Sequence, residues 1–331
     1  MTLGPEVSFL VGPINVEDLA RVPGTQWLIG SGMASVGRPA GRLHVIHAHD
    51  GRWSAHTPDT IPVDHDDRYG PAGPPSSSNF DAHGVTLRPG SDGHHTLYLV
   101  NHGGREAIEV FDVDATVEPP RLTWLGAIAQ DDRGWGNAVA LLPDGGLVAT
   151  NFLDLEDQEA LSKISAGEFT GNLKEWHPGA GWSDVPGSEC CAPNGVEASA
   201  DGRWLYMCAW GVNKVVRVSR GVEHVLRSEV DVDVMPDNVK WGGDGRLLVA
   251  GSVSTPAVVF ERTNTEDDCN LPLRAVRIDP ETLEVEEAVF LAHEVFGTAA
   301  TAYDVGTELW IASPRSDRVA RFPGRGLGAE L

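Results

Sequence analysis

The chain has 331 residues, of which 25 are Lys or Arg and 48 are Asp or Glu, so its formal net charge is −23. A hydrophobic fraction of 41% with 22% charged residues is typical of a folded protein. It has no basic run suited to phosphates and no apolar stretch long enough to span a bilayer, so neither nucleic acid nor a membrane is an expected partner. The first residues lack the pattern of a secretory signal, which predicts a cytoplasmic location.

A turn that contains glycine, followed by a short apolar strand, recurs along the chain. The six copies cover residues 23–30, 92–100, 144–150, 201–207, 244–250 and 305–312. Such a turn between apolar runs favours a β-hairpin. The mean spacing of about 55 residues is near the roughly 40–50 residues of a four-stranded propeller blade. We therefore predict an all-β protein in which residues 1–331 form a single six-bladed β-propeller domain.

Further strands are expected downstream of most of these copies, at residues 108–111, 214–218, 257–260 and 318–322. The only helix-like stretch lies around residues 153–165. In such a propeller the innermost strands point polar side chains into a central channel. We therefore expect the functional residues at one mouth of that channel.

Polar residues stand upstream of the first five hairpins, where an apolar strand residue would be expected. If each lies on the innermost strand of its blade, their side chains converge on one mouth of the channel. Those with oxygen donors are Glu17, Asn137, Asn194, Asp237 and Asn238. Ca²⁺ takes about six to eight oxygen ligands, whereas Zn²⁺ prefers His and Cys. The set predicts one calcium site, although Asn-Gly and Asp-Asn are also common turn residues.

Two histidines lie close to the same register. His83 precedes the second hairpin, and His102 lies just past the end of the strand that follows. An imidazole beside a metal-polarised carbonyl can act as a general base toward water, because its pKa lies near neutrality. The alternative is a hydrogen-bonded histidine at a strand end. His47 and His49 would share one face of a strand and are a weaker candidate for a minor metal site.

Short motifs over nearly the whole chain match one known family in their order and spacing. They are residues 16–19, 27–33, 83–85, 100–102, 137, 194–196, 237–239 and 297–312. The chain resembles the calcium-dependent paraoxonases, within the wider group of propellers that includes gluconolactonase and senescence marker protein. The resemblance implies a catalytic Ca²⁺ held by the five oxygen donors named above, with His83 and His102 acting on water. The implied substrate is a small-molecule lactone or carboxylic ester, such as an aryl ester.

The sequence departs from the family pattern in two places. The family's second, structural calcium uses the residue after the first-blade glutamate, here Asp18, and an aspartate at the position of Ala138. Because Ala138 offers no carboxylate, this position argues against the second ion. The family's membrane-associating helix and closing disulfide also have no counterpart. The ring would therefore be closed by strand pairing alone, between residues 7–11 and 318–322.

Other functions remain compatible with these residues. A propeller enzyme could catalyse another reaction, such as isomerisation or phosphotriester hydrolysis, and a propeller could also bind calcium without catalysis. Tyr69, Trp176 and Trp182 could line a substrate pocket, although loop aromatics more often anchor their own loop. The sequence indicates no particular oligomeric state.

Overall fold

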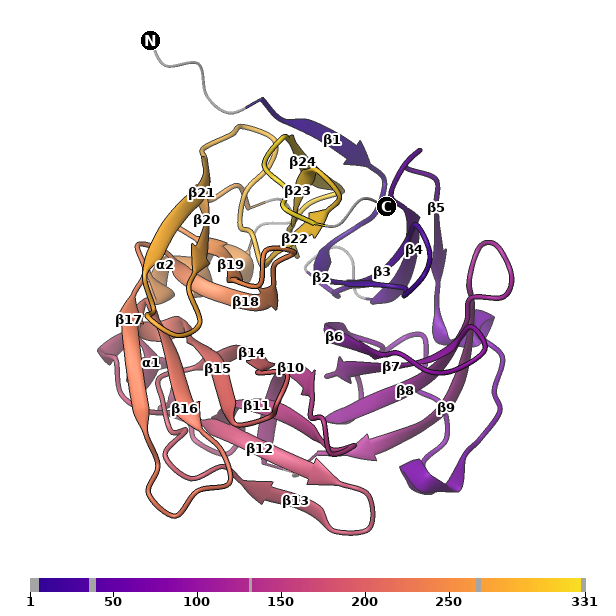
Figure 1. The fold of residues 1–331 in the computed structure, drawn as a ribbon, viewed down its shortest axis with the longest axis horizontal. Coiled ribbons are helices and arrows are strands. Elements are labelled where there is room, and N and C mark those ends of the chain that lie inside the picture. Colours follow the sequence, from indigo (N-terminus) through magenta and orange to yellow (C-terminus); the bar gives the residue numbers. More distant parts are fainter. Residues whose placement is uncertain (1–5, 36–39, 131–132, 266–268, 329–331) are drawn as a thin grey trace.

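In this computed structural model the chain forms six four-stranded sheets arranged in a ring (Figure 1). The structure describes residues 6–35, 40–130, 133–265 and 269–328. In the first five sheets the strands follow chain order from the central channel outward (Figure 1). The six-bladed β-propeller predicted from the repeated hairpins is confirmed.

Each predicted hairpin copy supplies the second strand of a blade. Blades 1 to 3 contain β2 (Val16–Arg21), β3 (Trp27–Gly32), β4 (Arg42–His47), β5 (Trp53–His56); β6 (Ala82–Arg88), β7 (His94–Asn101), β8 (Ala107–Asp114), β9 (Arg121–Ala129); and β10 (Gly134–Leu141), β11 (Leu147–Asp154), β12 (Asn172–His177), β13 (Gly181–Asp184). Blades 4 to 6 contain β14 (Pro193–Ala198), β15 (Trp204–Ala209), β16 (Lys214–Ser219), β17 (Arg227–Asp231); β18 (Met235–Trp241), β19 (Leu247–Ser252), β20 (Leu273–Ile278), β21 (Val285–Leu291); and β22 (Thr301–Val305), β23 (Glu308–Ala312), β24 (Arg318–Pro323), β1 (Ser8–Val11).

The two ends of the described chain close the ring within blade 6. β1 pairs antiparallel with β24, with Ser8 opposite Arg321 and Val11 opposite Arg318. This is the pairing expected from the sequence. It gives the last blade its fourth strand, so blade 6 matches the other five.

Two α-helices lie outside the blades, α1 (Ala160–Ala166) and α2 (Pro256–Thr263), together with the 3₁₀ helices Pro58–Thr60, Asp67–Tyr69 and Trp210–Val212. α1 confirms the second half of the predicted helical stretch. The strand predicted at residues 257–260 is wrong, because these residues belong to α2 and the third strand of blade 5 is β20. Pro256 begins this helix, a position that proline favours because the first helical N–H needs no partner. No helix in the described part of the chain is long and apolar enough to cross a membrane.

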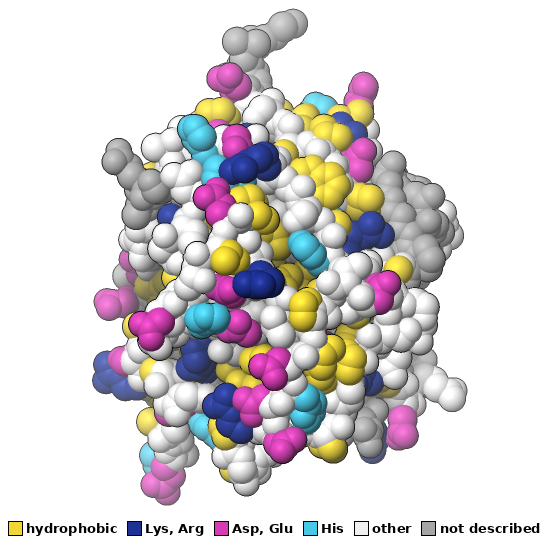
Figure 2. Space-filling model, turned by 90° about the vertical axis from the view of Figure 1, so that its right-hand side faces the viewer, with side chains coloured by type: hydrophobic (Ala, Val, Ile, Leu, Met, Phe, Trp, Pro, Cys, Tyr) yellow, Lys and Arg dark blue, Asp and Glu magenta, His cyan; other side chains and the backbone are white. Residues whose placement is uncertain are grey.

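Apolar side chains fill the spaces between neighbouring blades. Ile29 of blade 1 packs in one cluster with Leu99 of blade 2, and Leu248 of blade 5 packs in another with Ile311 of blade 6. Figure 2 shows the face on the right-hand side of Figure 1, where Lys and Arg side chains lie among Asp and Glu and apolar residues are scattered. The core therefore lies between the blades.

Candidate metal centre

A break in strand register turns polar side chains into the channel at the same level of five blades. Between the first and second strands of blades 1 to 5, the pairing shifts at Val16/Asp18, Ala82/Val85, Gly136/Val139, Pro193/Val196 and Pro236/Val239. The residues inside these shifts include Glu17, His83, Asn137, Asn194, Asp237 and Asn238. A β-bulge redirects side chains and is common beside functional sites. Repeated in five blades, it gathers the residues singled out by the sequence.

Two glycines in these bulges allow neighbouring inner strands to approach closely. A Cβ atom on Gly84 would lie 2.6 Å from the backbone oxygen of Asn137, and one on Gly195 would lie 2.6 Å from the Cα atom of Asn238. No larger residue fits at either position without moving the next blade. The His83-Gly84 and Asn194-Gly195 pairs therefore place a polar side chain and make room for its neighbour.

A cavity of about 210 Å³ brings most of the predicted site residues together. Its lining includes Glu17, His83, Asn137, Asn194 and Asp237. The two remaining predicted residues lie behind this lining. The Nδ2 atom of Asn238 donates to Oε1 of Glu17 at 2.5 Å, and Nε2 of His102 lies 2.9 Å from Nδ1 of His83.

Within the described residues, three buried side-chain oxygens around this cavity have no hydrogen-bond partner: Oε2 of Glu17, Oδ1 of Asn137 and Oδ1 of Asn194. The amide nitrogens are engaged elsewhere, since Nδ2 of Asn137 lies 3.3 Å from Nε2 of His83 and the Asn194 side chain bonds Asp237. An unpaired buried polar atom costs about 1–3 kcal/mol. A bound cation would give all three oxygens a partner.

The two carboxylates of the cavity are poorly stabilised as anions by the protein itself. Burial raises the pKa of Glu17 well above its usual value, and the nearby charges of Asp18 and Asp237 raise it further. Burial and Asp18 likewise raise the pKa of Asp237 to about 7, against a lowering effect of the bond from Asn194. A divalent cation would reverse both shifts, because it favours the ionised carboxylates.

The chemistry of the donors fits calcium. Among the described residues, no group of three or more His, Cys, Asp or Glu side chains is arranged to hold a metal ion. A cation in this cavity would therefore depend on amide oxygens as well as the two carboxylates. Hard Ca²⁺ accepts such a mixed oxygen set, and Zn²⁺ does not prefer it.

The two predicted histidines form one hydrogen-bonded line with a glutamate. Nδ1 of His102 lies 2.8 Å from Oε2 of Glu106, and its Nε2 contacts His83. On the cavity side, Nε2 of His83 lies 3.6 Å from Oε1 of Glu17. Burial, together with the neighbouring His102, lowers the pKa of His83 well below its usual value. This shift favours the neutral imidazole, in which one ring nitrogen carries no proton.

Aromatic rings form a continuous wall on one side of the cavity. Consecutive ring centroids are 5.7 Å apart between Trp135 and Phe152, 5.9 Å between Phe152 and Trp210, and 5.4 Å between Trp210 and Phe260. All four line the cavity. They come from β10, β11, the 3₁₀ helix Trp210–Val212 and α2.

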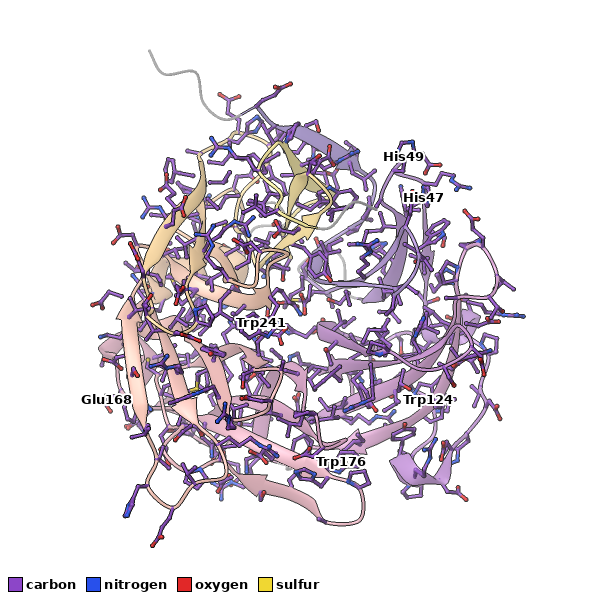
Figure 3. All side chains as sticks on the ribbon, viewed as in Figure 1. His47, His49, Trp124, Glu168, Trp176 and Trp241 are labelled. Atoms are coloured by element: carbon purple, nitrogen blue, oxygen red, sulfur yellow. The ribbon has the colours of Figure 1, made fainter. Side chains whose placement is uncertain are left out.

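The loop aromatics considered as pocket residues do not line this cavity. Trp176 is buried in a separate cluster against which Tyr69 and Trp182 pack, and the indole N–H of Trp182 donates to the carbonyl oxygen of Ala129. Trp176 and Trp182 lie on β12 and β13 and not in a loop, and only Tyr69 lies in the expected loop, within the 3₁₀ helix Asp67–Tyr69. His47 bonds Asp50 at 2.7 Å and, like His49, lies at the outer edge of blade 1, away from the channel (Figure 3).

The side chain of Asp18, considered for a second ion, is bound by a lysine of the chain itself. The ammonium of Lys240 lies 2.7 Å from Oδ2 of Asp18 and 3.0 Å from the carbonyl oxygen of Val85. Oδ1 of Asp18 accepts from the Leu19 N–H at 2.8 Å, and Oδ2 accepts from the Val85 N–H at 2.8 Å. The carboxylate that the resemblance assigns to a second calcium is therefore occupied by an ammonium group of the chain.

No protein-family model and no curated protein matches the sequence. Solved structures of low sequence identity match it in fold. A luciferin-regenerating enzyme has a TM-score of 0.60 at 15% identity, covering 99% of this chain and 100% of its own. A gluconolactonase from Xanthomonas campestris has a TM-score of 0.57 at 14% identity, covering 96% of this chain and 89% of its own. The calcium-binding protein regucalcin from Agrobacterium tumefaciens has a TM-score of 0.57 at 13% identity, covering 99% of this chain and 98% of its own. The chain shares its fold with these propellers.

Sequence reasoning missed three parts of this region: Glu106, Lys240 and the aromatic wall. Two of them had a visible signal. Lys240 stands on the predicted innermost strand, two residues after Asn238, and Trp135 stands two residues before Asn137. Glu106 lies in the loop between β7 and β8, where nothing in the sequence distinguishes it from other acidic loop residues.

Proposed function

We propose that the protein is a calcium-dependent hydrolase that opens a lactone or cleaves a carboxylic ester. The observation that carries this proposal is the set of unpaired buried oxygens that lines the same cavity as His83. The similarity in fold to a gluconolactonase and to calcium-binding regucalcin supports it.

Glu17, Asn137, Asn194 and Asp237 would hold the ion, with Asn238 as the fifth predicted donor beside Glu17. When bound, calcium would polarise the substrate carbonyl and stabilise the negative charge that develops on its oxygen. Calcium binds carboxylates in their ionised form and amides through their neutral oxygens, so the protein's part is to hold Glu17 and Asp237 in one cavity with Asn137 and Asn194.

His83 would act as the general base. Its neutral ring has its lone pair on Nε2 at the wall of the cavity, where a water molecule would take the place of the 3.3 Å contact with Nδ2 of Asn137. His102, bonded to the other ring nitrogen, would orient His83 and accept part of the positive charge that forms on it.

The wall of Trp135, Phe152, Trp210 and Phe260 favours an apolar or aromatic acyl or leaving group. A sugar lactone with several hydroxyl groups would lose hydrogen bonds to water against this wall without regaining them. We therefore place aryl esters and alkyl-substituted lactones ahead of sugar lactones as substrates.

The test combines calcium content with hydrolysis. The purified protein is analysed for metal and assayed with aryl esters, alkyl lactones and gluconolactone, before and after chelation. We expect about one calcium per chain and turnover that chelation abolishes and calcium restores. Calcium without turnover would indicate a non-catalytic calcium-binding propeller, and a protein without calcium would refute the proposed centre.

A further inference from the structure

The loop between β7 and β8 carries both His102 and Glu106, and it is firmly held. The side-chain oxygen of Asn101 accepts from the N–H groups of Asp81 and Gly103, at 3.1 and 2.9 Å. The backbone oxygen of Glu106 accepts from the Gln130 N–H at 3.0 Å. Both ends of the loop are therefore fixed, and the contact between Glu106 and His102 is part of a built structure.

The charge on Glu106 decides where the protons of the two imidazoles lie. An ionised carboxylate only accepts hydrogen bonds, so Nδ1 of His102 must carry a proton toward Oε2 of Glu106. Asp81, the other carboxylate near His102, instead accepts from the Ala34 N–H at 2.7 Å. In a neutral His102 the Nε2 atom is then an acceptor, and the Nδ1–H group of His83 donates a hydrogen bond to it.

The same order continues to the cavity. With its proton on Nδ1, a neutral His83 has a bare Nε2, which accepts from the amide N–H of Asn137 at 3.3 Å. That contact turns Oδ1 of Asn137 toward the cavity, where it is buried without a partner. With the opposite tautomer, Nε2–H of His83 would attract the oxygen of Asn137, and the amide N–H₂ would face the cation.

We propose that Glu106 is a positioning residue that acts through His102 and His83 to aim the Asn137 oxygen into the cavity and keep Nε2 of His83 unprotonated. Its consequence for catalysis rests on the proposed function. The positions of the protons on His83 and His102 do not depend on the proposed function, because they are a property of the metal-free protein.

The experiment measures imidazole ¹⁵N chemical shifts of the metal-free protein, which report the tautomer of each ring, and calcium affinity by calorimetry. We expect His83 and His102 of the unmodified protein to carry their protons on Nδ1. Glu106→Leu should leave His102 as a mixture of tautomers and lower calcium affinity and kcat by about 10-fold each, as loss of a partner behind a metal ligand does. Glu106→Gln, which keeps an acceptor oxygen, should retain the tautomers and most of the affinity.

Asp50→Asn is the matched control. Asp50 contacts Nδ1 of His47 at 2.7 Å, a similar pairing at the outer edge of blade 1, so this variant should leave the rings of His83 and His102 and the calcium affinity unchanged. A proton on Nε2 of His83 in the unmodified protein overturns the inference, whether or not Glu106→Leu folds. Unchanged imidazole ¹⁵N shifts and an unchanged calcium affinity in Glu106→Leu would also overturn the inference. If shifts and affinity respond while no ester or lactone is hydrolysed, the inference stands and the proposed function fails.

Discussion

The two halves of the channel bury similar acidic residues and treat them differently. In the far half, Asp18 is bound by the ammonium of Lys240 and by backbone N–H groups. In the other half, here called the open half, Oε2 of Glu17 and the amide oxygens of Asn137 and Asn194 are buried without hydrogen-bond partners among the described residues. The ring therefore neutralises Asp18 with Lys240, whereas the cavity, whose lining also includes the buried Arg315, keeps three oxygens arranged for a cation from solution.

The two halves are joined by Asn238 and Thr301. Nδ2 of Asn238 contacts Oε1 of Glu17 and the hydroxyl of Thr301, and that hydroxyl lies 3.0 Å from Oδ1 of Asp18. Thr301 lies on β22, whose pairing with β23 is regular. The two halves are therefore in contact, and the charge of Asp18 also acts on Glu17 and Asp237.

The largest expected effect comes from removing a carboxylate of the open half. Asp237→Ala should abolish calcium binding and hydrolysis together, because it deletes one of the two anionic groups that line the cavity. Calorimetry and ester hydrolysis measure the two losses. The matched control is Asp233→Asn, a solvent-exposed carboxylate shortly before the same strand, which should bind calcium as the unmodified protein does. If Asp237→Ala still binds calcium normally, the ion is held elsewhere.

His83→Gln should separate binding from chemistry within the open half. A glutamine side chain at this position cannot accept a proton from water, so we expect turnover to fall by about 10²–10⁴-fold. Calcium should still bind, because the carboxylates and amide oxygens remain. The check is kcat in a variant shown by metal analysis to carry its calcium. A rate near that of the unmodified protein would remove His83 from the mechanism.

The far half is tested by removing its internal cation. Lys240→Met leaves Asp18 buried without its ammonium partner, and breaking such a pair costs about 3–5 kcal/mol. Lys214→Met is the control: Lys214 makes partly exposed ion pairs with Glu229 and Asp231, so its loss should cost at most about 1 kcal/mol. Denaturant unfolding measures both. Equal small losses would mean that the two halves do not differ as described.

The open half was predictable from the sequence because it repeats. Glu17, His83, Asn137, Asn194 and Asp237 each stand a similar distance before a hairpin, and the propeller turns that spacing into one level of the channel. A repeat therefore carries information about spatial neighbours that a single motif would not.

The far half was not predictable in the same way, because its contacts join residues without a shared motif. Lys240 and Asp18 are 222 positions apart and meet only across the channel. The strand wrongly predicted at residues 257–260 had a related cause, since the apolar run of α2 resembles a strand until the helix start at Pro256 is considered. Calcium ligation and catalysis by the predicted residues stay predictions until the variants above are measured.

The remaining expected effect is a dependence of stability on pH that calcium changes only in part. The folded-state pKa of Asp237 is about 7, above its ordinary value of 3.8, so between these values the native state binds more protons than the unfolded state. The free energy of unfolding of the metal-free protein should therefore fall as pH rises from about 4 to about 7, and Glu17 shifts in the same direction. Bound calcium should remove this contribution, because it favours the ionised carboxylates.

The pKa of Glu197, in the far half, is also raised, but its effect on stability should not depend on calcium. Burial raises its pKa to about 7, and it lines a separate cavity with Lys240, so calcium should not affect it. The free energy of unfolding, measured with denaturant at several pH values, should fall steeply as pH rises without calcium and less steeply with calcium. Glu197→Gln should reduce the slope that remains when calcium is bound. Equal slopes of the free energy of unfolding against pH, with and without calcium, would contradict the difference between the halves. The carboxylates of the cavity would then not be the ones whose ionised form calcium stabilises.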